Sequence, residues 1–408
     1  MWPPDPPLQD VMNGKHRRAA GATSWGASAR SPPAPVPGPP PRSAANHLSA
    51  AVAFLLVGAC SDPSSPPGAG SGLEALGCDL DLAYMADGGV GRDGVPSLTN
   101  PLLTSPESQE GLGYLEPSDR VVGVVLGGQA MAIPHNIFWH HEIVNLDLES
   151  GPVTVSYCPL TGSALAFGRE AVNGQEFGVS GLLYKNNLVM WNRTEEESLW
   201  VQMEGVAGCG PDRGTPLPRV PVLEATWEGW QALHPGTVVV SESGIDLDRD
   251  YTFNPYRQYE ADRRYLHEDE MPPLDPRRPP KERVLGIPDG HGGGVAFPFG
   301  LLDEAGEFAA VSVEIGGDPI VVLWDRRWGA AMAYHWPQVD GAPVSFSVSE
   351  FGIEDESGSR WGVHGRSQFG PRAGMTMMPV ATAHIAFWGA WAAFHPDTEV
   401  WAPGADGN

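Results

Sequence analysis

The sequence predicts a mainly β protein, α+β with short helices, built as two duplicated, related β-rich lobes. Three observations support this prediction. Gly 51 and Pro 41 are high counts for 408 residues, and they favour turns and short strands over long helices. Apolar residues occur in short alternating runs, which are typical of strands. Two stretches of the chain also repeat each other in the same order.

The N-terminal part, residues 1–60, is typical of an extension followed by a lipoprotein signal. The apolar run from Leu48 to Ala59 is too short to span a bilayer but suits the hydrophobic region of a signal peptide. It ends in V-G-A-C, which is similar to the motif at which bacterial lipoproteins are lipidated. We therefore predict lipid attachment at Cys60, which anchors the chain to a bacterial membrane in the cell envelope, on the periplasmic or extracellular side. Residues 61–94 are expected to form a flexible tether.

The internal repeat divides the rest of the chain into a first lobe at 95–240, a polar linker at 241–283 and a second lobe at 284–403. Near the ends of the lobes the matching residues keep an offset of 160 or 161, which is too steady for chance. These matches pair Trp200, Gly205, Pro211, Gly214, Trp230, His234, Pro235 and Thr237 with Trp361, Gly365, Pro371, Gly374, Trp391, His395, Pro396 and Thr398.

Each lobe contains a predicted helix, at Trp227–Leu233 and at Phe387–Phe394. Both helices run into a His-Pro pair and are expected to end there, because proline cannot continue a helix. His234 and His395 occur in both lobes, so we expect them to serve the shared scaffold by closing the helix ends through hydrogen bonds. Strands are predicted at 153–157 and at the matching 320–324.

The linker is rich in charged residues, Pro and Tyr. It places Asp246, Asp248 and Asp250 at alternate positions, as calcium loops do, but it lacks the Gly and the bidentate Glu of such loops. A solvated acidic segment is therefore the expectation.

Charge and cysteine content limit the possible partners and chemistry. The formal net charge is −25, which repels phosphate backbones, so nucleic acid is excluded as an expected partner. If Cys60 is lipidated, three of the four cysteines remain, and an odd number leaves at least one thiol free. Pairing of Cys78 with Cys209 would leave Cys158 reduced or metal-bound, but the sequence does not decide the pairing.

The segments F-W-H-H-E-I-V-N and S-Y-C-P-L-T-G-S have no equivalent chemistry in the second lobe. Imidazole, carboxylate and thiolate together suit zinc or copper, so the candidate metal ligands are His140, His141, Glu142 and Cys158. The same group also suits a Cys158 nucleophile served by His141, with Glu142 orienting the imidazole. In a third interpretation the His and Glu satisfy buried backbone groups, and the Cys is a small core residue.

These segments resemble the bacterial and archaeal family called domain of unknown function 3179. Its W-H-E-I-V-N-D, Y-C-P-L-C-G-T and S-G-L-L-Y-x-x-N-L-V-M motifs resemble His140–Leu146, Tyr157–Ser163 and Ser180–Met190, and its H-P-D-T resembles both H-P-x-T ends. The resemblance extends from about Val95 to Trp401. It implies a site made of His141, Glu142, Asn145, Cys158, Tyr184, Asn187 and Met190.

Two positions depart from the family pattern. The family's Trp is His140 here, and its second Cys is Thr161, which argues against CxxC redox chemistry and a two-thiolate metal site. The family has no established activity, so the resemblance implies an architecture and the position of a site, with Tyr184, Asn187 and Met190 lining a pocket that would hold a ligand or cofactor.

The sequence thus predicts a cell-envelope lipoprotein of this family with a metal-binding pocket in the first lobe, zinc and copper being the candidate metals. One alternative is a non-enzymatic envelope protein that binds a small molecule or a partner, and another is a Cys-nucleophile enzyme. Besides the metal or small-molecule ligand, the membrane is the expected partner, through Cys60.

Overall fold

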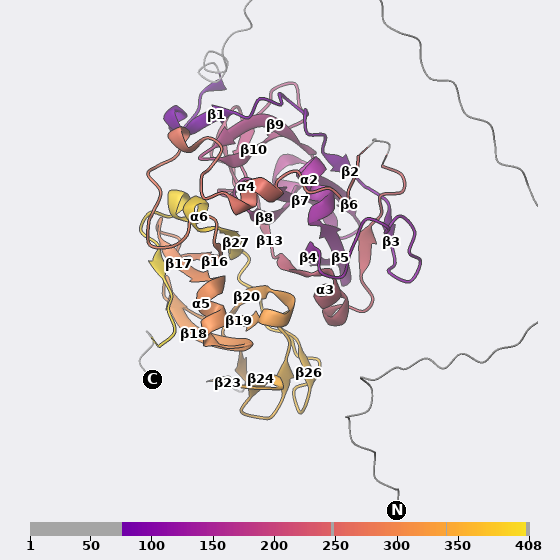
Figure 1. Cartoon of the computed structure of the whole chain (residues 1–408), viewed down its shortest axis with the longest axis vertical. Helices are drawn as coiled ribbons and strands as arrows, with labels where there is room; N and C mark the ends of the chain where they lie inside the picture. Colours follow the sequence, from indigo (N-terminus) through magenta and orange to yellow (C-terminus); the bar gives the residue numbers. More distant parts are fainter. Residues whose placement is uncertain (1–75, 246–248, 340, 405–408) are drawn as a thin grey trace, which may run out of the picture. The chain divides into compact units, whose positions relative to one another are not determined.

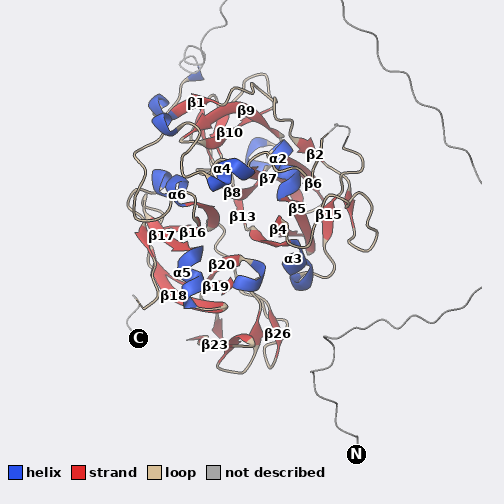
Figure 2. Ribbon diagram, in the orientation of Figure 1, coloured by secondary structure: helices blue, strands red, loops and turns tan. Residues whose placement is uncertain are grey.

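The computed structural model describes residues 76–245, 249–339 and 341–404 (Figure 1). Strands predominate and the helices are short (Figure 2), so the predicted mainly β class with short helices is confirmed. The predicted signal, Cys60 and residues 61–75 of the predicted tether lie outside the described residues, as do Asp246 and Asp248 of the considered calcium loop. No helix in the described ranges is long and apolar enough to cross a membrane.

Three five-stranded sheets are formed by residues before 241. The first has the order β1 (Met85–Asp87), β9 (Phe177–Tyr184), β10 (Asn187–Asn192), β11 (Leu199–Val201), β12 (Val206–Cys209). The second has the order β13 (Arg219–Val220), β8 (Ser163–Gly168), β7 (Gly151–Cys158), β6 (Ile143–Leu148), β2 (Leu98–Thr99). The third has the order β14 (Leu223–Thr226), β4 (Arg120–Leu126), β5 (Gln129–Pro134), β15 (Val238–Val240), β3 (Leu103–Thr104).

The remaining sheets are formed by residues after 282. One has the order β27 (His384–Phe387), β16 (Arg283–Pro288), β17 (Gly294–Pro298), β28 (Glu399–Val400). Another has the order β18 (Phe308–Ile315), β19 (Asp318–Asp325), β20 (Ala330–His335). The last two are β23 (Phe346–Ser349), β24 (Gly352–Asp355), β25 (Arg360–Trp361), β26 (Ser367–Phe369), and the pair β21 (Gln338–Val339), β22 (Ala342–Pro343).

The α-helices of the described residues are α2 (His135–His141), α3 (Trp227–Leu233), α4 (Arg257–Ala261), α5 (Phe299–Ala305) and α6 (Trp388–Phe394). Helix α3 begins where the Thr226 hydroxyl accepts a bond from the amide of Gly229, at 3.2 Å, as an N-cap does. It matches the predicted span, and α6 begins one residue later than predicted because Phe387 is its N-cap.

Both helices end at the predicted His-Pro pairs, and each histidine bonds to the helix through its main chain. The main-chain N–H of His234 donates to Trp230, whereas the His234 ring stacks on the Trp230 ring with centroids 4.1 Å apart. His395 lies in the same way against Trp391, at 4.0 Å. Both histidines therefore close their helix ends through main-chain hydrogen bonds, while their rings pack on the tryptophans.

Corresponding strands of the two halves pair alike. Strand β5 pairs antiparallel with β4 and parallel with β15, and β17 pairs in the same manner with β16 and β28. A Cβ built on Gly123 would come within 2.1 Å of Trp230, and one on Gly286 within 2.3 Å of Trp391. Both sheets therefore need glycine at the point where the tryptophan lies on them. The duplication itself stays an inference from the sequence.

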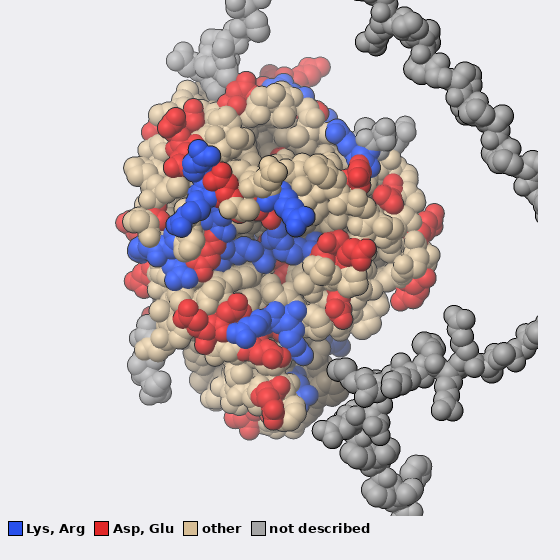
Figure 3. All heavy atoms as spheres, in the orientation of Figure 1, with Lys and Arg blue, Asp and Glu red and all other residues tan. Residues whose placement is uncertain are grey.

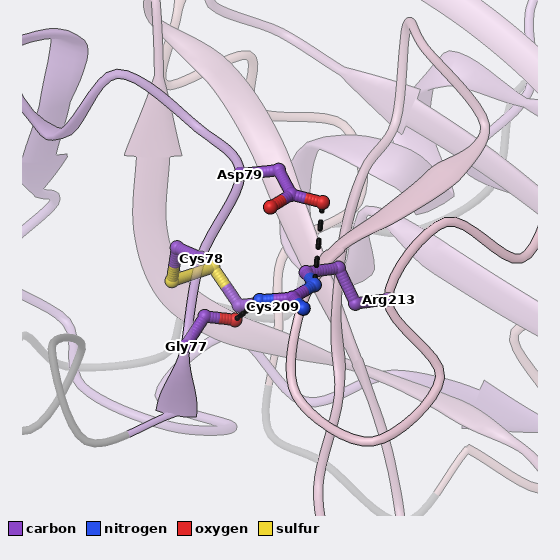
Figure 4. Close-up of a disulfide and its surroundings, with 5 residues drawn as sticks. All are labelled: Gly77, Cys78, Asp79, Cys209 and Arg213. Atoms are coloured by element: carbon purple, nitrogen blue, oxygen red, sulfur yellow. Dashed lines mark hydrogen bonds and ion pairs between the residues drawn. A yellow bond between two sulfur atoms is a disulfide. The ribbon is translucent and has the colours of Figure 1, made fainter.

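The N-terminal end of the described chain is fastened by a disulfide. Cys78 bonds to Cys209 at the end of β12, with an S–S distance of 2.11 Å, and Asp79 forms an ion pair with Arg213 at 3.2 Å (Figure 4). The pairing that the sequence left open is thus the one in the structure. Within the described residues Cys158 is a free, buried cysteine.

Candidate functional site

Histidine 141 is held in the core by two oxygen atoms. It is the last residue of α2, and its Nδ1 lies 2.8 Å from the carbonyl oxygen of Pro96. Its Nε2 lies 2.8 Å from the hydroxyl of Tyr251. Burial lowers the pKa of His141 to about 4, so the ring is neutral near pH 7. Because a carbonyl can only accept, Nδ1 carries the proton and Nε2 accepts from Tyr251.

Histidine 140 faces the same neighbour from the other side. Its Nε2 lies 3.3 Å from the carbonyl oxygen of Phe253, and its ring meets the edge of Tyr251 at 5.5 Å. Both histidines are thus directed toward residues 251–253 and bonded there to oxygen atoms. Neither acts as a partner of the Cys158 thiol, so the predicted Cys–His arrangement is not formed.

Glutamate 142 occupies an unusual backbone conformation at the end of α2. Its φ is 55° and its ψ is −30°, a region that side chains other than glycine rarely adopt. The chain turns here directly into β6, and the carbonyl of Glu142 accepts the amide of Tyr157 at 2.8 Å. Such local strain persists only where the surrounding structure imposes it, and it occurs often at functional sites.

The Glu142 carboxyl lies near the Cys158 thiol and Tyr256. The residue keeps some exposed surface, yet protein surrounds the carboxyl, and this burial raises its pKa to about 8. No described residue donates a hydrogen bond to it. Its charge is felt at Cys158, where it raises the thiol pKa, and at Tyr256. A carboxyl with a pKa near neutrality, beside a thiol, is suited to proton transfer.

Cysteine 158 ends β7, and its thiol is 1% exposed. Burial, followed by the charge of Glu142, raises the pKa of the thiol to about 11. The hydroxyl and amide of Thr161 and the amide of Leu188 act in the opposite direction, because they can donate hydrogen bonds to a thiolate. The turn from Cys158 to Thr161 therefore supplies donors for a negative sulfur, while the surroundings keep the sulfur protonated.

A buried polar network continues from Thr161. The Thr161 hydroxyl lies 2.8 Å from that of Ser163 and accepts a bond from the Asn187 amide at 3.0 Å. The Asn187 amide also donates to Gln202 at 2.8 Å, and Gln202 donates to Ser156 at 3.1 Å. All five side chains are fully buried. Such a satisfied network holds the turn beside Cys158 in one conformation.

The predicted pocket residues on β9 and β10 have separate roles. Asn187 belongs to the buried network, and Met190 is fully buried in the core beside Phe177 and Trp200. Tyr184 lies with Tyr84 and Phe394 on another side of the sheet. Asn145, also implied by the resemblance, joins β6 to β9 by donating to the carbonyl of Phe177 at 2.9 Å. Asn187 is thus connected to the turn beside Cys158, and Met190 shares a core cluster with Cys158.

The segment expected to be a solvated linker covers the thiol instead. We call residues 249–283 the covering segment. It brings Tyr256, Tyr259 and Tyr265 close to Cys158. Burial raises the pKa of each phenol, and the charge of Cys158 raises it further. Tyr251, Tyr265 and Met271 are buried, so the solvated expectation is wrong for them. The interspersed tyrosines were the signal for a packed segment, and the surrounding charges concealed it.

Specific bonds fix the covering segment in place. The Tyr259 hydroxyl donates to the carbonyl of Leu160, in the Cys158 turn, at 2.7 Å. The Asn186 amide donates to the carbonyl of His267 at 2.8 Å. Lys281 lies 3.1 Å from the centroid of the Tyr259 ring, a cation–π contact. Helix α4, which carries Tyr259, lies near α2 and β7 in Figure 1.

The described residues contain no group of three or more His, Cys, Asp and Glu side chains that could hold a metal ion. The physical reason is visible in the proposed ligands. His141 uses both ring nitrogens on oxygen atoms, and His140 is directed to Phe253. The structure therefore brings Glu142 and Cys158 together and leaves the two histidines out, so the predicted four-residue metal site is not assembled.

A buried ionic cluster was missed by the sequence analysis. His135 Nε2 lies 3.1 Å from a carboxylate oxygen of Glu224, and Arg283 lies 3.2 Å from the same oxygen. The Tyr157 ring lies 4.2 Å from His135. The sequence signal for this cluster was Glu224, a charged residue within the otherwise uncharged strand L-E-A-T. On the surface, Lys and Arg side chains gather across the middle of the face shown in Figure 3.

Comparison with known proteins gives a family without an assigned activity. No curated protein and no solved structure matches the chain. The family model described as "Protein of unknown function (DUF3179)" matches residues 92–398, a range that contains the Cys158 turn, Glu142 and the whole covering segment. This match extends over more than half of the chain, and the protein therefore belongs to the DUF3179 family.

Proposed function

We propose that Cys158 and Glu142 form a gated acid–thiol site that binds a small electrophilic ligand covalently, in a protein of the cell envelope. The observation that carries this proposal is Glu142, with its strained backbone and its carboxyl of raised pKa, beside a thiol that has hydrogen-bond donors nearby. Of the functions that the sequence left open, this is the Cys-nucleophile alternative, with Glu142 in the place expected for histidine.

The proposed step is an addition. The thiol proton passes to the Glu142 carboxylate, and the sulfur electron pair forms a bond to an electrophilic carbon of the ligand. Glu142 then delivers the proton to the atom that has taken up the negative charge, so no further reactant is needed. The donors from Thr161 and Leu188 stabilise the sulfur while it is negative.

Access requires movement of the covering segment. In the closed arrangement the thiol is 1% exposed, beneath Tyr256, Tyr259 and Tyr265. A cavity of about 440 Å³ lies on this segment and is lined by Tyr259 and Tyr265 among others. A ligand that enters there would meet the two rings above Cys158. Displacing them would also return water to the thiol and lower its pKa toward the ordinary value.

The direct test is alkylation of Cys158 by iodoacetamide, followed by mass spectrometry. We expect slow labelling of the wild-type protein near pH 7 and at least tenfold faster labelling after Tyr259→Ala. Tyr84→Ala is the matched control, because Tyr84 is a tyrosine that packs on Tyr184 and Lys185 rather than on the thiol. Equal rates in all three proteins would contradict gating by the covering segment.

A non-enzymatic binding role is the second candidate. It is favoured by the thiol pKa of about 11, since a thiol that stays protonated is a poor nucleophile. In that case Cys158→Ser would leave ligand binding intact, whereas the covalent site requires the sulfur atom.

For location, we propose a lipoprotein anchored through Cys60. The apolar run and V-G-A-C motif support this, and so does the Cys78–Cys209 disulfide, because such bonds form and persist in oxidising compartments outside the cytosol. Incorporation of labelled palmitate into the wild-type protein, and its loss in Cys60→Ser, is the expected result. Equal incorporation into both proteins, or none into either, would contradict the anchor.

A further inference from the structure

A second cavity, remote from Cys158, gathers side chains that suit a soft metal ion. It has a volume of about 170 Å³, and its lining includes His234, His364, Met332 and Met377. The set joins the two halves of the protein: His234 follows α3, Met332 lies in β20, and the other two residues follow β25 and β26. Val222, Leu223 and Trp230 supply apolar walls.

The two imidazoles lie at a separation that one ion can bridge. Their ring centroids are 5.2 Å apart and their planes meet at 83°. Two imidazoles on one tetrahedral ion, with metal–nitrogen bonds of about 2 Å, have centroids roughly 5 Å apart. The cavity wall therefore holds the two rings close to the distance that shared coordination requires.

The ring nitrogens of this pair lack protein partners. No described residue forms a hydrogen bond with the imidazole of His234 or His364, and Nδ1 of His364 is buried without a partner. Leaving such a group unpaired in apolar surroundings costs free energy. Gly362 makes room for this nitrogen, because a Cβ at that position would lie 2.4 Å from it. One of the two histidines that line the cavity thus has a buried ring nitrogen without a partner.

The donor types of the set suit a soft ion, since imidazole nitrogen is a common ligand of copper. The two methionines supply thioether sulfur, a soft donor that selects Cu(I) over harder cations such as magnesium or calcium.

The corresponding place in the other half lacks these ligands. The sequence correspondence puts Glu204 opposite His364, Leu217 opposite Met377 and Leu165 opposite Met332. Arg219 corresponds to Pro379, and its guanidinium lies 5.0 Å from the centroid of the Phe167 ring. Burial lowers the pKa of His395, and the charge of Arg219 lowers it further. The isolated bridges Val206–Pro216 and Arg366–Thr376 support this correspondence. The ligand set is therefore specific to one of two similar places.

We propose that His234, His364, Met332 and Met377 form a binding site for a soft monovalent metal ion of the Cu(I) class. With two histidines and two methionines the site has the donors that this ion prefers, and it is independent of the acid–thiol site. The histidine previously assigned to the scaffold alone, His234, thereby acquires a second role.

The test uses Ag(I), a redox-stable probe for Cu(I) sites, with full-length protein in a Cys60→Ser, Cys158→Ser background that removes competing thiols. Native mass spectrometry and quenching of tryptophan fluorescence report binding, since Trp230 stacks on His234. We expect one tightly bound equivalent. Affinity should fall at least tenfold in Met377→Leu, a nearly volume-conserving change, and further in the double variant with His364→Gln.

Two controls separate this site from adventitious binding. Met378→Leu alters the adjacent methionine, which is 65% exposed and does not line the cavity, and His395→Gln alters the corresponding histidine of the other half. Neither should change the affinity. Absence of a tight equivalent, or equal affinity in Met377→Leu and Met378→Leu, would overturn the proposal. Melting temperatures show which variants are folded. If the variant with His364→Gln does not fold, the affinity of Met377→Leu decides the outcome.

Discussion

Glu142 lies close enough to Cys158 for its charge to raise the pKa of the thiol, after the larger effect of burial. Burial raises the pKa of the carboxyl to about 8 and that of the thiol to about 11. A one-unit difference corresponds to about 1.4 kcal/mol, so moving the proton from sulfur to carboxylate costs on the order of 4 kcal/mol in the closed protein. That cost is small enough to be met when a ligand displaces the covering segment.

Glu142 should make the protein less stable as pH rises. Its folded pKa, about 8, is above the value of 4.5 expected when unfolded. The folded state therefore holds the extra proton, and this stabilising contribution is fully present below pH 4.5 and lost toward pH 8. We expect Glu142→Gln to remove a decline on the order of 5 kcal/mol between these values, which are about 3.5 pKa units apart. Urea unfolding at several pH values measures it, with Glu228→Gln as a control on the exposed side of α3.

The buried histidines should act in the opposite direction. Burial lowers the pKa of His135 and His141 to about 4, and that of His384 to about 3, from 6.5. Their contribution is fully present above pH 6.5 and is lost as pH falls through 4, because the unfolded chain binds the protons. Circular dichroism during acid titration should show unfolding between these values. A protein that keeps its native spectrum at pH 4 would contradict the assigned neutral state of these rings.

Loss of the disulfide should destabilise the fold. It closes a loop across a sequence separation of 131 residues, so replacing both Cys78 and Cys209 by Ser should cost about 2–5 kcal/mol. Dithiothreitol should lower the melting temperature of the wild-type protein and of Cys158→Ser, but not that of the double variant. A wild-type protein that is insensitive to complete reduction would contradict this role.

The bond from Tyr251 to His141 can be removed without changing the packed volume greatly. Tyr251→Phe leaves the buried Nε2 of His141 without its donor, which should cost about 1–3 kcal/mol. Tyr256→Phe is the matched control, since no described residue bonds to its hydroxyl, and it should change stability by less than about 0.5 kcal/mol. Chemical unfolding compares the two, and equal effects would count against the assigned hydrogen bond.

The sequence predicted the fold class, the α3 helix and the presence of Cys158 and Glu142 in one region. It did so because alternating runs, His-Pro ends and family motifs are local signals. The roles of His140 and His141 depend on Pro96, Tyr251 and Phe253, which are distant in sequence, so adjacency to Glu142 gave a wrong arrangement. The covering segment was missed for a related reason: its charges face outward while its tyrosines pack inward.

The soft-metal cavity shows a further limit of sequence reasoning. His234 recurs as His395, and a recurring residue was assigned to the scaffold. The neighbours that distinguish the two places, Met332 and Met377, come from separate segments and gain significance only through the cavity that they share.

The pH dependence of Cys158 alkylation in the Tyr259→Ala background tests the central claim most directly, by comparing proteins with and without Glu142→Gln. If Glu142 accepts the thiol proton, the Tyr259→Ala protein that keeps Glu142 should show an inflection in the labelling rate near pH 8. This inflection reports the coupled titration of Glu142 and Cys158. Glu142→Gln should abolish this inflection and slow labelling at pH 8. If Glu142→Gln instead moves the profile to lower pH and speeds labelling, Glu142 is only a repelling charge, and the proposed acid–thiol site is contradicted.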